Sequence, residues 1–219
     1  MNTRIVLLGP PASGKGTLAA LIAEKYGIPS ASTGALLREE EHQNTALGQA
    51  ARAFTREGKY FPDEMALAVV ERWLDAHASA RGFVLDGFPR TLAQAGKFDE
   101  DLAERHGELD IAINLELGEA EIRRRIESRL TCPRCAATYR NGGDGAREGG
   151  ECPNCGAVLQ RRRDDTLETL SERLRQHNQL TEPVVEYYRQ TGRLRTVDAA
   201  PGSAAVFAVI SQILEGVPA

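Results

Sequence analysis

Short apolar runs recur along this chain and alternate with segments of helical period. The runs RIVLL at 4–8, GFVL at 82–85 and DIAINL at 110–115 are bounded by glycine or polar residues. LRTVD at 194–198 and a weaker stretch at 28–31 complete the set. Runs that are apolar on both faces of a strand are typical of parallel sheets covered on each side. The pattern therefore predicts a buried parallel sheet.

Helical patterns lie between these runs. After the first run, Leu18, Leu21 and Ile22 repeat at a spacing near 3.6 residues, which indicates a helix with one apolar face. Residues 165–189 predict one or two long polar helices, and 203–214 a terminal amphipathic helix. Strands that alternate with helices predict an α/β fold with a doubly wound parallel sheet.

Residues 131–160 depart from this alternation. Cysteine, glycine and proline accumulate there, and the stretch NGGDGAREGGE has neither helical nor strand period. A chain of 219 residues exceeds one average domain of ~150 residues by about half. We therefore expect one core domain that carries an insertion.

The insertion holds all four cysteines as two CxxC pairs. Cys132 and Cys135 are separated from Cys152 and Cys155 by sixteen residues, which lies in the ~15 to 20 range of zinc sites. Four thiolates leave no open coordination position, so the spacing predicts a structural zinc that stabilises the insertion. A redox CxxC pair is the weaker interpretation.

A phosphate-binding loop follows the first predicted strand. GPPASGKGT at Gly9 to Thr17 joins that strand to a helix, the context in which backbone amides and a helix N-terminus converge on a phosphate. Lys15 adds a positive charge. The strict pattern has serine or threonine directly after the lysine, whereas Gly16 stands here and Thr17 follows.

Charge and hydropathy narrow the partners. Lys+Arg 27 against Asp+Glu 31 gives a net charge of -4, which disfavours a nucleic-acid partner. No apolar run approaches the ~18 residues that cross a bilayer, and the N-terminus is too weakly apolar for a secretory signal. We therefore expect a cytoplasmic protein with no membrane partner.

Three motifs together carry a resemblance to a known family. The loop GPPASGKGT, STG at Ser32 to Gly34 and LDGFPRT at Leu85 to Thr91 occur in the order found in adenylate kinases. The chain resembles that family over nearly its whole length, in the long-lid form with a zinc site. The resemblance implies a P-loop NTPase-type core with five strands. It implies three parts: a core of 1–31, 62–127 and 166–219, a helical segment for the nucleoside monophosphate (NMP) at 32–61, and a zinc-stabilised lid at 128–165.

The resemblance also implies the reaction and its ligands. The expected activity is reversible, Mg²⁺-dependent transfer between ATP and AMP to give two ADP, by a monomer. The implied ATP-binding residues are Ala12, Ser13, Gly14, Lys15, Gly16, Thr17, Arg129, Thr138, Tyr139 and Pro201. The implied AMP-binding residues are Thr33, Arg38, Lys59, Tyr60, Phe61, Gly87, Phe88, Pro89, Arg90, Gln94, Arg162 and Arg173. Among them, Gln94 would read adenine, because an amide offers both a donor and an acceptor.

Phosphoryl transfer requires charge neutralisation and alignment more than covalent help from the protein. The implied catalytic residues are therefore mostly cations: Lys15, Arg90, Arg125, Arg129, Arg162 and Arg173. Asp86 ends a predicted strand at the edge where an open α/β sheet binds its ligands, and it would order the magnesium shell.

Other charged residues receive no catalytic role. Arg123, Arg124, Arg161 and Arg163 are expected on solvated faces, as most charge runs are. His42, His77, His106 and His177 are expected at the surface. Asp164 and Asp165 are expected to pair with arginines as the lid closes.

Two residues depart from the family pattern. Ala12 stands where a loop glycine is usual, and Ala35 where an aspartate is common. A positive φ at Ala12 would cost about 1 kcal/mol but would keep the backbone donors.

Two other functions stay open. The first is a kinase for another nucleoside monophosphate, which Gln94 disfavours. The second is a nucleotide-switched binding module. A switch requires only the phosphate loop, so it is disfavoured by the six matched arginines: Arg38, Arg90, Arg125, Arg129, Arg162 and Arg173.

Overall fold

The computed structural model describes residues 3–77, 81–105, 107–135, 137–143, 145–162 and 165–216. Within them, five parallel strands form the central sheet in the order β2-β3-β1-β4-β7. The strands are β2 (Ser30–Ser32), β3 (Gly82–Asp86), β1 (Thr3–Leu8), β4 (Ile111–Glu116) and β7 (Leu194–Asp198). The predicted five-stranded parallel sheet is confirmed, and the weak stretch at 28–31 forms its strand two residues later.

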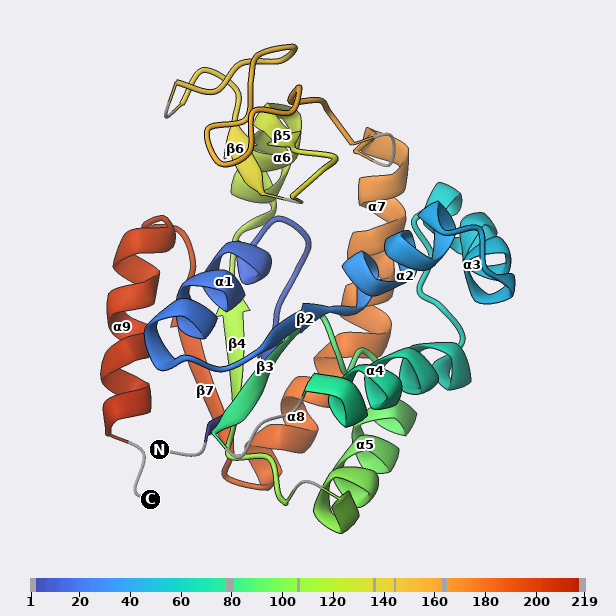
Figure 1. The fold of residues 1–219 in the computed structure, drawn as a ribbon. Helices are drawn as coiled ribbons and strands as arrows, with labels where there is room; N and C mark the ends of the chain where they lie inside the picture. Colours follow the sequence, from blue (N-terminus) through green and yellow to red (C-terminus); the bar gives the residue numbers. More distant parts are fainter. Residues whose placement is uncertain are drawn as a thin grey trace.

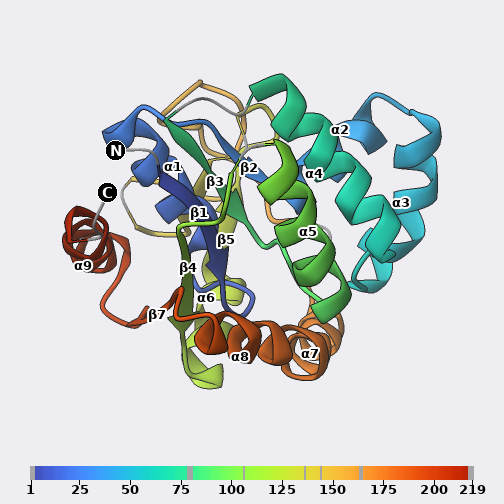
Figure 2. The ribbon, with the colours of Figure 1, turned by 90° about the horizontal axis from the view of Figure 1, so that it is seen from below.

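Helices cover both faces of this sheet (Figures 1 and 2). On one face lie α1 (Lys15–Tyr26) and α9 (Ser203–Glu215), which contact each other. The other face is covered by α4 (Asp63–His77), α5 (Leu92–Arg105) and α8 (Glu182–Gln190). The predicted terminal helix is thus present as α9.

The alternating side chains of β1 supply both cores. Ile5 and Leu7 pack with α1 and α9, whereas Val6 and Leu8 pack with α4, α5 and α8. All four are almost fully buried. Successive strand residues point to opposite faces, so a run that is apolar at every position serves a sheet covered on both sides.

The polar stretch over 165–190 forms two helices joined by a π-helical turn. α7 (Leu167–Gln176) begins with a capping box between Thr166 and Thr169. η1 (His177–Thr181) is the π turn, and α8 follows directly. Pro183 lies in the first turn of α8, where its missing N–H is tolerated. The prediction of one or two helices in this region is confirmed.

Two further segments project from the core. α2 (Thr33–His42) and α3 (Ala46–Glu57) occupy most of 32–61. α6 (Glu119–Ser128) leads into the antiparallel pair β5 (Arg129–Thr131) and β6 (Thr138–Arg140), at the top of Figure 1. The β5–β6 region has its own small apolar cluster around the cysteines. None of the described helices is long and apolar enough to span a membrane.

Candidate functional site

A cleft of about 810 Å³ opens where the core, the α2–α3 segment and the β5–β6 region meet. Its lining includes most of the residues that the sequence predicts for the site. These are Ala12, Ser13, Gly14, Lys15, Gly16, Thr17, Arg38, Lys59, Tyr60, Phe61, Asp86, Gly87, Pro89, Arg90, Arg125, Arg129, Thr138, Tyr139, Arg162, Arg173 and Pro201. Segments that are far apart in the sequence thus share one cavity.

Lys15 lies at the start of α1, at the bottom of the phosphate loop. Its Nζ donates hydrogen bonds to the carbonyl oxygens of Gly9 and Pro10, each at 2.8 Å. Burial lowers the pKa of Lys15 to about 8, against the opposing effect of the Asp86 carboxylate. A buried ammonium that is stabilised chiefly by neutral carbonyls gains strongly from a nearby anion.

The loop reaches this shape through positive φ angles. Gly14, directly before α1, has φ +97°, and Ala12 has φ +59°. Ala12 therefore takes the left-handed conformation whose strain was anticipated. Its side chain also packs against the apolar cluster formed by Ile122, Ile126 and Leu170.

Arg90 is fixed by the loop that precedes it. Its backbone N–H donates to Gln94 Oε1 at 2.8 Å, and its Nε donates to the Gly87 carbonyl at 2.6 Å. Gly87 has φ +69°, and a Cβ there would lie 2.9 Å from Arg90 Nη2. The positive φ favours glycine at this turn, and a Cβ there would displace the guanidinium from its present position.

Asp165 links two arginines that line the cleft. Arg129 Nε donates to Asp165 Oδ2 at 2.7 Å, and its Nη2 pairs with Oδ1. Arg173 Nη1 lies 3.5 Å from the same Oδ1, and the Asp165 side chain is nearly fully buried. The predicted pairing of Asp165 with arginines is confirmed, whereas Asp164 lies outside the described residues.

Three predicted ligands are not part of the cleft lining. Gln94 is buried, and its Nε2 donates to Asp63 Oδ1 at 2.8 Å while its Oε1 accepts from Arg90. Phe88 is fully buried and meets Phe98 edge-on at 5.2 Å. Thr33 is also buried, and among the described residues its hydroxyl has no hydrogen-bond partner.

The prediction that His177 is a surface residue is wrong. His177 lies in η1 and is 4% exposed. Burial, and to a lesser extent the positive charge of Lys15, lowers its pKa to about 4. His42 and His77 are exposed as predicted, and His106 lies outside the described residues.

The arginines predicted at the solvent form exposed ion pairs. Arg123 pairs with Glu119, Arg124 with Glu121 and Arg161 with Glu148. Arg163 lies outside the described residues. Such exposed pairs contribute little to stability and carry no site.

Several lining residues were not anticipated. They come from β6 and the turn after it, from η1 and from the start of α9: Arg140, Gly143, Thr181, Gly202, Ser203, Ala204 and Val206. Gly202, Ser203 and Ala204 follow Pro201 directly, so their proximity could have been inferred from it. No pattern in the local sequence predicts that Thr181 lines the cleft.

The four cysteines form a compact cluster that could hold a metal. Their Sγ atoms all lie within 4.8 Å of one another, with Cys132 to Cys155 at 3.3 Å and Cys135 to Cys152 at 3.7 Å. Tetrahedral Zn–S bonds of about 2.3 Å place the sulfurs roughly 3.8 Å apart. The donor set and its size therefore fit a four-thiolate zinc site.

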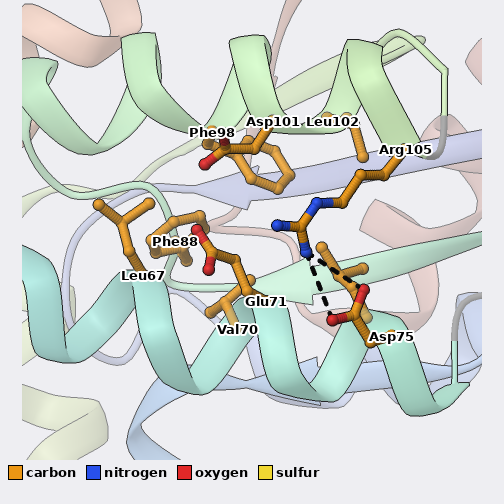
Figure 3. Close-up of a pocket in the computed structure, with 10 residues that line it drawn as sticks. Leu67, Val70, Glu71, Asp75, Phe88, Phe98, Asp101, Leu102 and Arg105 are labelled. Carbon is orange, nitrogen blue, oxygen red and sulfur yellow. Dashed lines mark hydrogen bonds and ion pairs between the residues drawn. The ribbon is translucent and has the colours of Figure 1, made fainter.

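A second, much smaller cavity lies between α4 and α5 (Figure 3). It measures about 10 Å³ and is lined by apolar side chains and by the carboxylates Glu71, Asp75 and Asp101. Arg105 bridges its edge to Asp75 at 3.4 Å. Its size and its negative lining exclude it as a nucleotide site.

Comparisons with known proteins agree with this geometry. The family model described as adenylate kinase matches residues 7–193. An adenylate kinase of Archaeoglobus fulgidus is 43% identical over 211 residues, which cover 96% of this chain and 97% of that protein. Adenylate kinases of Syntrophomonas wolfei and Carboxydothermus hydrogenoformans are each 39% identical and cover 96% and 97% of this chain, with 98% and 99% of their own lengths. The chain belongs to the adenylate kinase family.

Proposed function

We propose that this chain catalyses the reversible, magnesium-dependent transfer of the γ-phosphoryl group of ATP to AMP, which yields two ADP. The observation that carries this proposal is the cleft in which the phosphate loop meets arginines from α2, the loop after β3, α6, β5, β6 and α7. Membership of the adenylate kinase family supports the same reaction. Charge stabilisation and alignment, which phosphoryl transfer requires, are what such a cleft provides.

We assign ATP to the side of the cleft formed by the phosphate loop and the lid. Backbone amides of Ala12 to Thr17 and the N-terminus of α1 face the phosphates, and Lys15 neutralises their charge. Arg125 holds the loop in place from α6, since its Nη1 lies 3.5 Å from the Ala12 carbonyl and its Nη2 donates to Ala199 at 2.8 Å. Thr138, Tyr139 and Pro201 enclose the sugar and base.

The residues beside Lys15 fit a magnesium ion that arrives with ATP. Asp86 ends β3, and its Oδ2 lies 3.3 Å from where a Cβ on Gly16 would be. Carboxylate and hydroxyl oxygens suit Mg²⁺, so Asp86 and Thr17 are the residues that would hold it. With magnesium bound, this position supplies positive charge to the phosphates that carry the transferred group.

We assign AMP to the side formed by α2, the loop after α3, and the loop after β3. Arg38, Arg90 and Arg173 lie where they can bind its phosphate, and Lys59 to Phe61 line the pocket beside it. The buried hydroxyl of Thr33 lies next to Ser32 and Gly34, which both line the cleft. Arg129 and Arg162 then neutralise the negative charge of the phosphoryl group during its transfer, while the lid excludes water.

The choice of adenine rests on the relatives and on Gln94. Its amide is engaged by Arg90 and Asp63, so reading a base would require it to exchange those partners. A kinase for another nucleoside monophosphate is therefore the second candidate. We further propose zinc as the metal of the cysteine cluster and a monomer as the working form, without nucleic-acid or membrane partners.

A direct assay tests the reaction. Purified protein is incubated with Mg-ATP and, separately, AMP, GMP, CMP or UMP, and each nucleotide is resolved by chromatography over time. We expect ADP formation only with AMP, at one AMP consumed per ATP. Transfer to a different monophosphate would replace the adenine assignment, and transfer to none would favour a nucleotide-switched module. Arg90→Ala is the matched control, for which we expect a large loss of turnover with the fold intact.

A further inference from the structure

Thr181, the last residue of η1, is buried between two parts of the cleft. It is 3% exposed, and its Oγ1 lies 3.1 Å from the Arg90 carbonyl and 3.1 Å from the Tyr60 hydroxyl. Arg90 belongs to the loop after β3, and Tyr60 to the loop after α3. One hydroxyl thus joins two loops that both contribute to the AMP side of the cleft.

The direction of these hydrogen bonds follows from their chemistry. A threonine hydroxyl has one hydrogen, and the Arg90 carbonyl can only accept. Thr181 therefore donates to Arg90, and Tyr60 donates to the Thr181 oxygen. The hydroxyl is both donor and acceptor at once, which a valine of the same shape could not replace.

Tyr60 in turn packs against the guanidinium of Arg90. The centre of that guanidinium lies 4.6 Å from the centroid of the Tyr60 ring, within the range of a cation–π contact. The Arg90 Nε is already bonded to Gly87. The ring and the Gly87 carbonyl together define the plane in which the outer nitrogens of Arg90 face the cleft.

The π turn explains why Thr181 can take part. Gln176, directly before η1, accepts from the Tyr60 N–H at 2.6 Å and donates to the Gly58 carbonyl at 3.4 Å. In an α-helix, residues five apart point about 140° away from each other. A π turn closes hydrogen bonds between residues i and i+5 and so brings Gln176 and Thr181 to the same side. Both can then contact the Tyr60 loop.

We propose that Thr181 is a positioning residue for Arg90 in phosphoryl transfer. Its hydroxyl orders the backbone of Arg90 and, through Tyr60, the plane of the guanidinium. Arg90 then meets the reacting phosphates without reorganisation, which is the condition for efficient electrostatic stabilisation. This inference rests on the role of Arg90 given under the proposed function.

The test uses the full-length protein with its metal and a series of isosteric changes. Thr181→Val removes the hydroxyl, Thr181→Ser restores it, and Thr3→Val is the matched control. Thr3 is also buried but lies at the amino end of β1, away from the cleft. Thr181→Val and Arg90→Ala are combined as well, because residues that act through one another give non-additive effects.

We measure kcat, KM for AMP, KM for ATP and the unfolding midpoint of each variant. Thr181→Val should lower kcat/KM for AMP by about tenfold, and Thr181→Ser should recover it to within roughly threefold. KM for ATP should stay within about twofold, and in the Arg90→Ala background Thr181→Val should lower kcat by less than about twofold. Thr3→Val should behave like the unchanged protein.

Either of two results would overturn the proposal. One is a Thr181→Val enzyme with unchanged kcat and KM for AMP, and the other is the same tenfold loss in the Arg90→Ala background. If Thr181→Val does not fold, Tyr60→Phe decides. It removes the hydrogen bond from Tyr60 to Thr181, one of the two that Thr181→Val removes, and keeps the ring. Unchanged kcat/KM for AMP in that variant would also refute the proposal. Failure of the proposed function would look different, because the unchanged protein itself would transfer no phosphoryl group to AMP.

Discussion

The buried His177 provides a test of the electrostatics behind the phosphate loop. Its side chain lies in η1 with Nδ1 3.4 Å from Asn178 Oδ1 and 3.8 Å from Glu182 Oε1. Among the described residues, its Nε2 has no hydrogen-bond partner. Burial and the positive charge of Lys15 are the main causes that lower its pKa from 6.5 to about 4, and Arg90 adds to them. We predict that replacing His177 by leucine flattens the dependence of stability on pH.

The size of the effect follows from linkage. Between about pH 4 and pH 6.5 the unfolded chain binds a proton at His177 that the folded chain does not, so stability rises with pH across that window. One pKa unit corresponds to about 1.36 kcal/mol, so the stability lost below both pKa values approaches about 3 kcal/mol. Between pH 7 and pH 5, protonation of His177 in the unfolded chain lowers the free energy of unfolding by about 2 kcal/mol.

Urea unfolding followed by circular dichroism at a series of pH values measures this. Other acidic and metal-binding groups also change stability over the same range, so the informative quantity is the difference between the variant and the unchanged protein. His177→Leu should reduce the loss between pH 7 and pH 5 by about 2 kcal/mol. His42→Leu is the control, because the exposed His42 side chain meets water in both states. If His177→Leu loses as much stability on acidification as the unchanged protein, the side chain is not buried as a neutral imidazole and the reasoning fails.

Four further predictions concern the site. Removing the metal with a chelator should lower the unfolding midpoint. Tyr139→Phe removes the hydroxyl that lies 3.3 Å from Cys152 Sγ. This variant should release zinc about tenfold or more faster in a colorimetric chelator assay. Gly87→Ala should lower kcat by about 100-fold, because the new Cβ would displace Arg90. An unchanged kcat in steady-state kinetics would show that the loop relaxes and that Arg90 keeps its position. As pH rises through about 8, Lys15 loses its charge, so kcat/KM for ATP should fall with an apparent pKa near 8 in a pH–rate profile; a flat profile to pH 9.5 would contradict the burial of its ammonium.

Features that depend on local sequence were predictable. The strands were marked by runs such as residues 4–8, because a strand covered on both faces needs an apolar side chain at every position. The cysteine cluster was marked by its spacing, since two CxxC turns can present four thiolates to one ion. The phosphate loop was marked by small residues and a lysine between a strand and a helix.

Features that depend on packing between distant segments were not. The pattern over 165–189 predicted helix, but it could not reveal the π turn at His177–Thr181, whose first and last residues are both buried. Gln94 is a second residue whose contact with a distant segment could not be predicted. Its spacing from Arg90 predicts a base contact, which stays a prediction, but it could not reveal that the amide also donates to Asp63, 31 residues away in the sequence.

The lowered pKa values of Lys15 and His177 arise first from burial, and the cations around the cleft add to that effect. Arg90 lowers the pKa of both groups and Arg129 lowers that of Lys15, whereas the Asp86 carboxylate raises the pKa of Lys15. Buried cations that lie close together destabilise the folded state, as expected for a site that is organised to bind phosphates. An anionic nucleotide relieves this repulsion, so its binding stabilises the folded state by mass action and also restores the charge of Lys15. The cations around the cleft thus favour the binding of ligands that carry several negative charges.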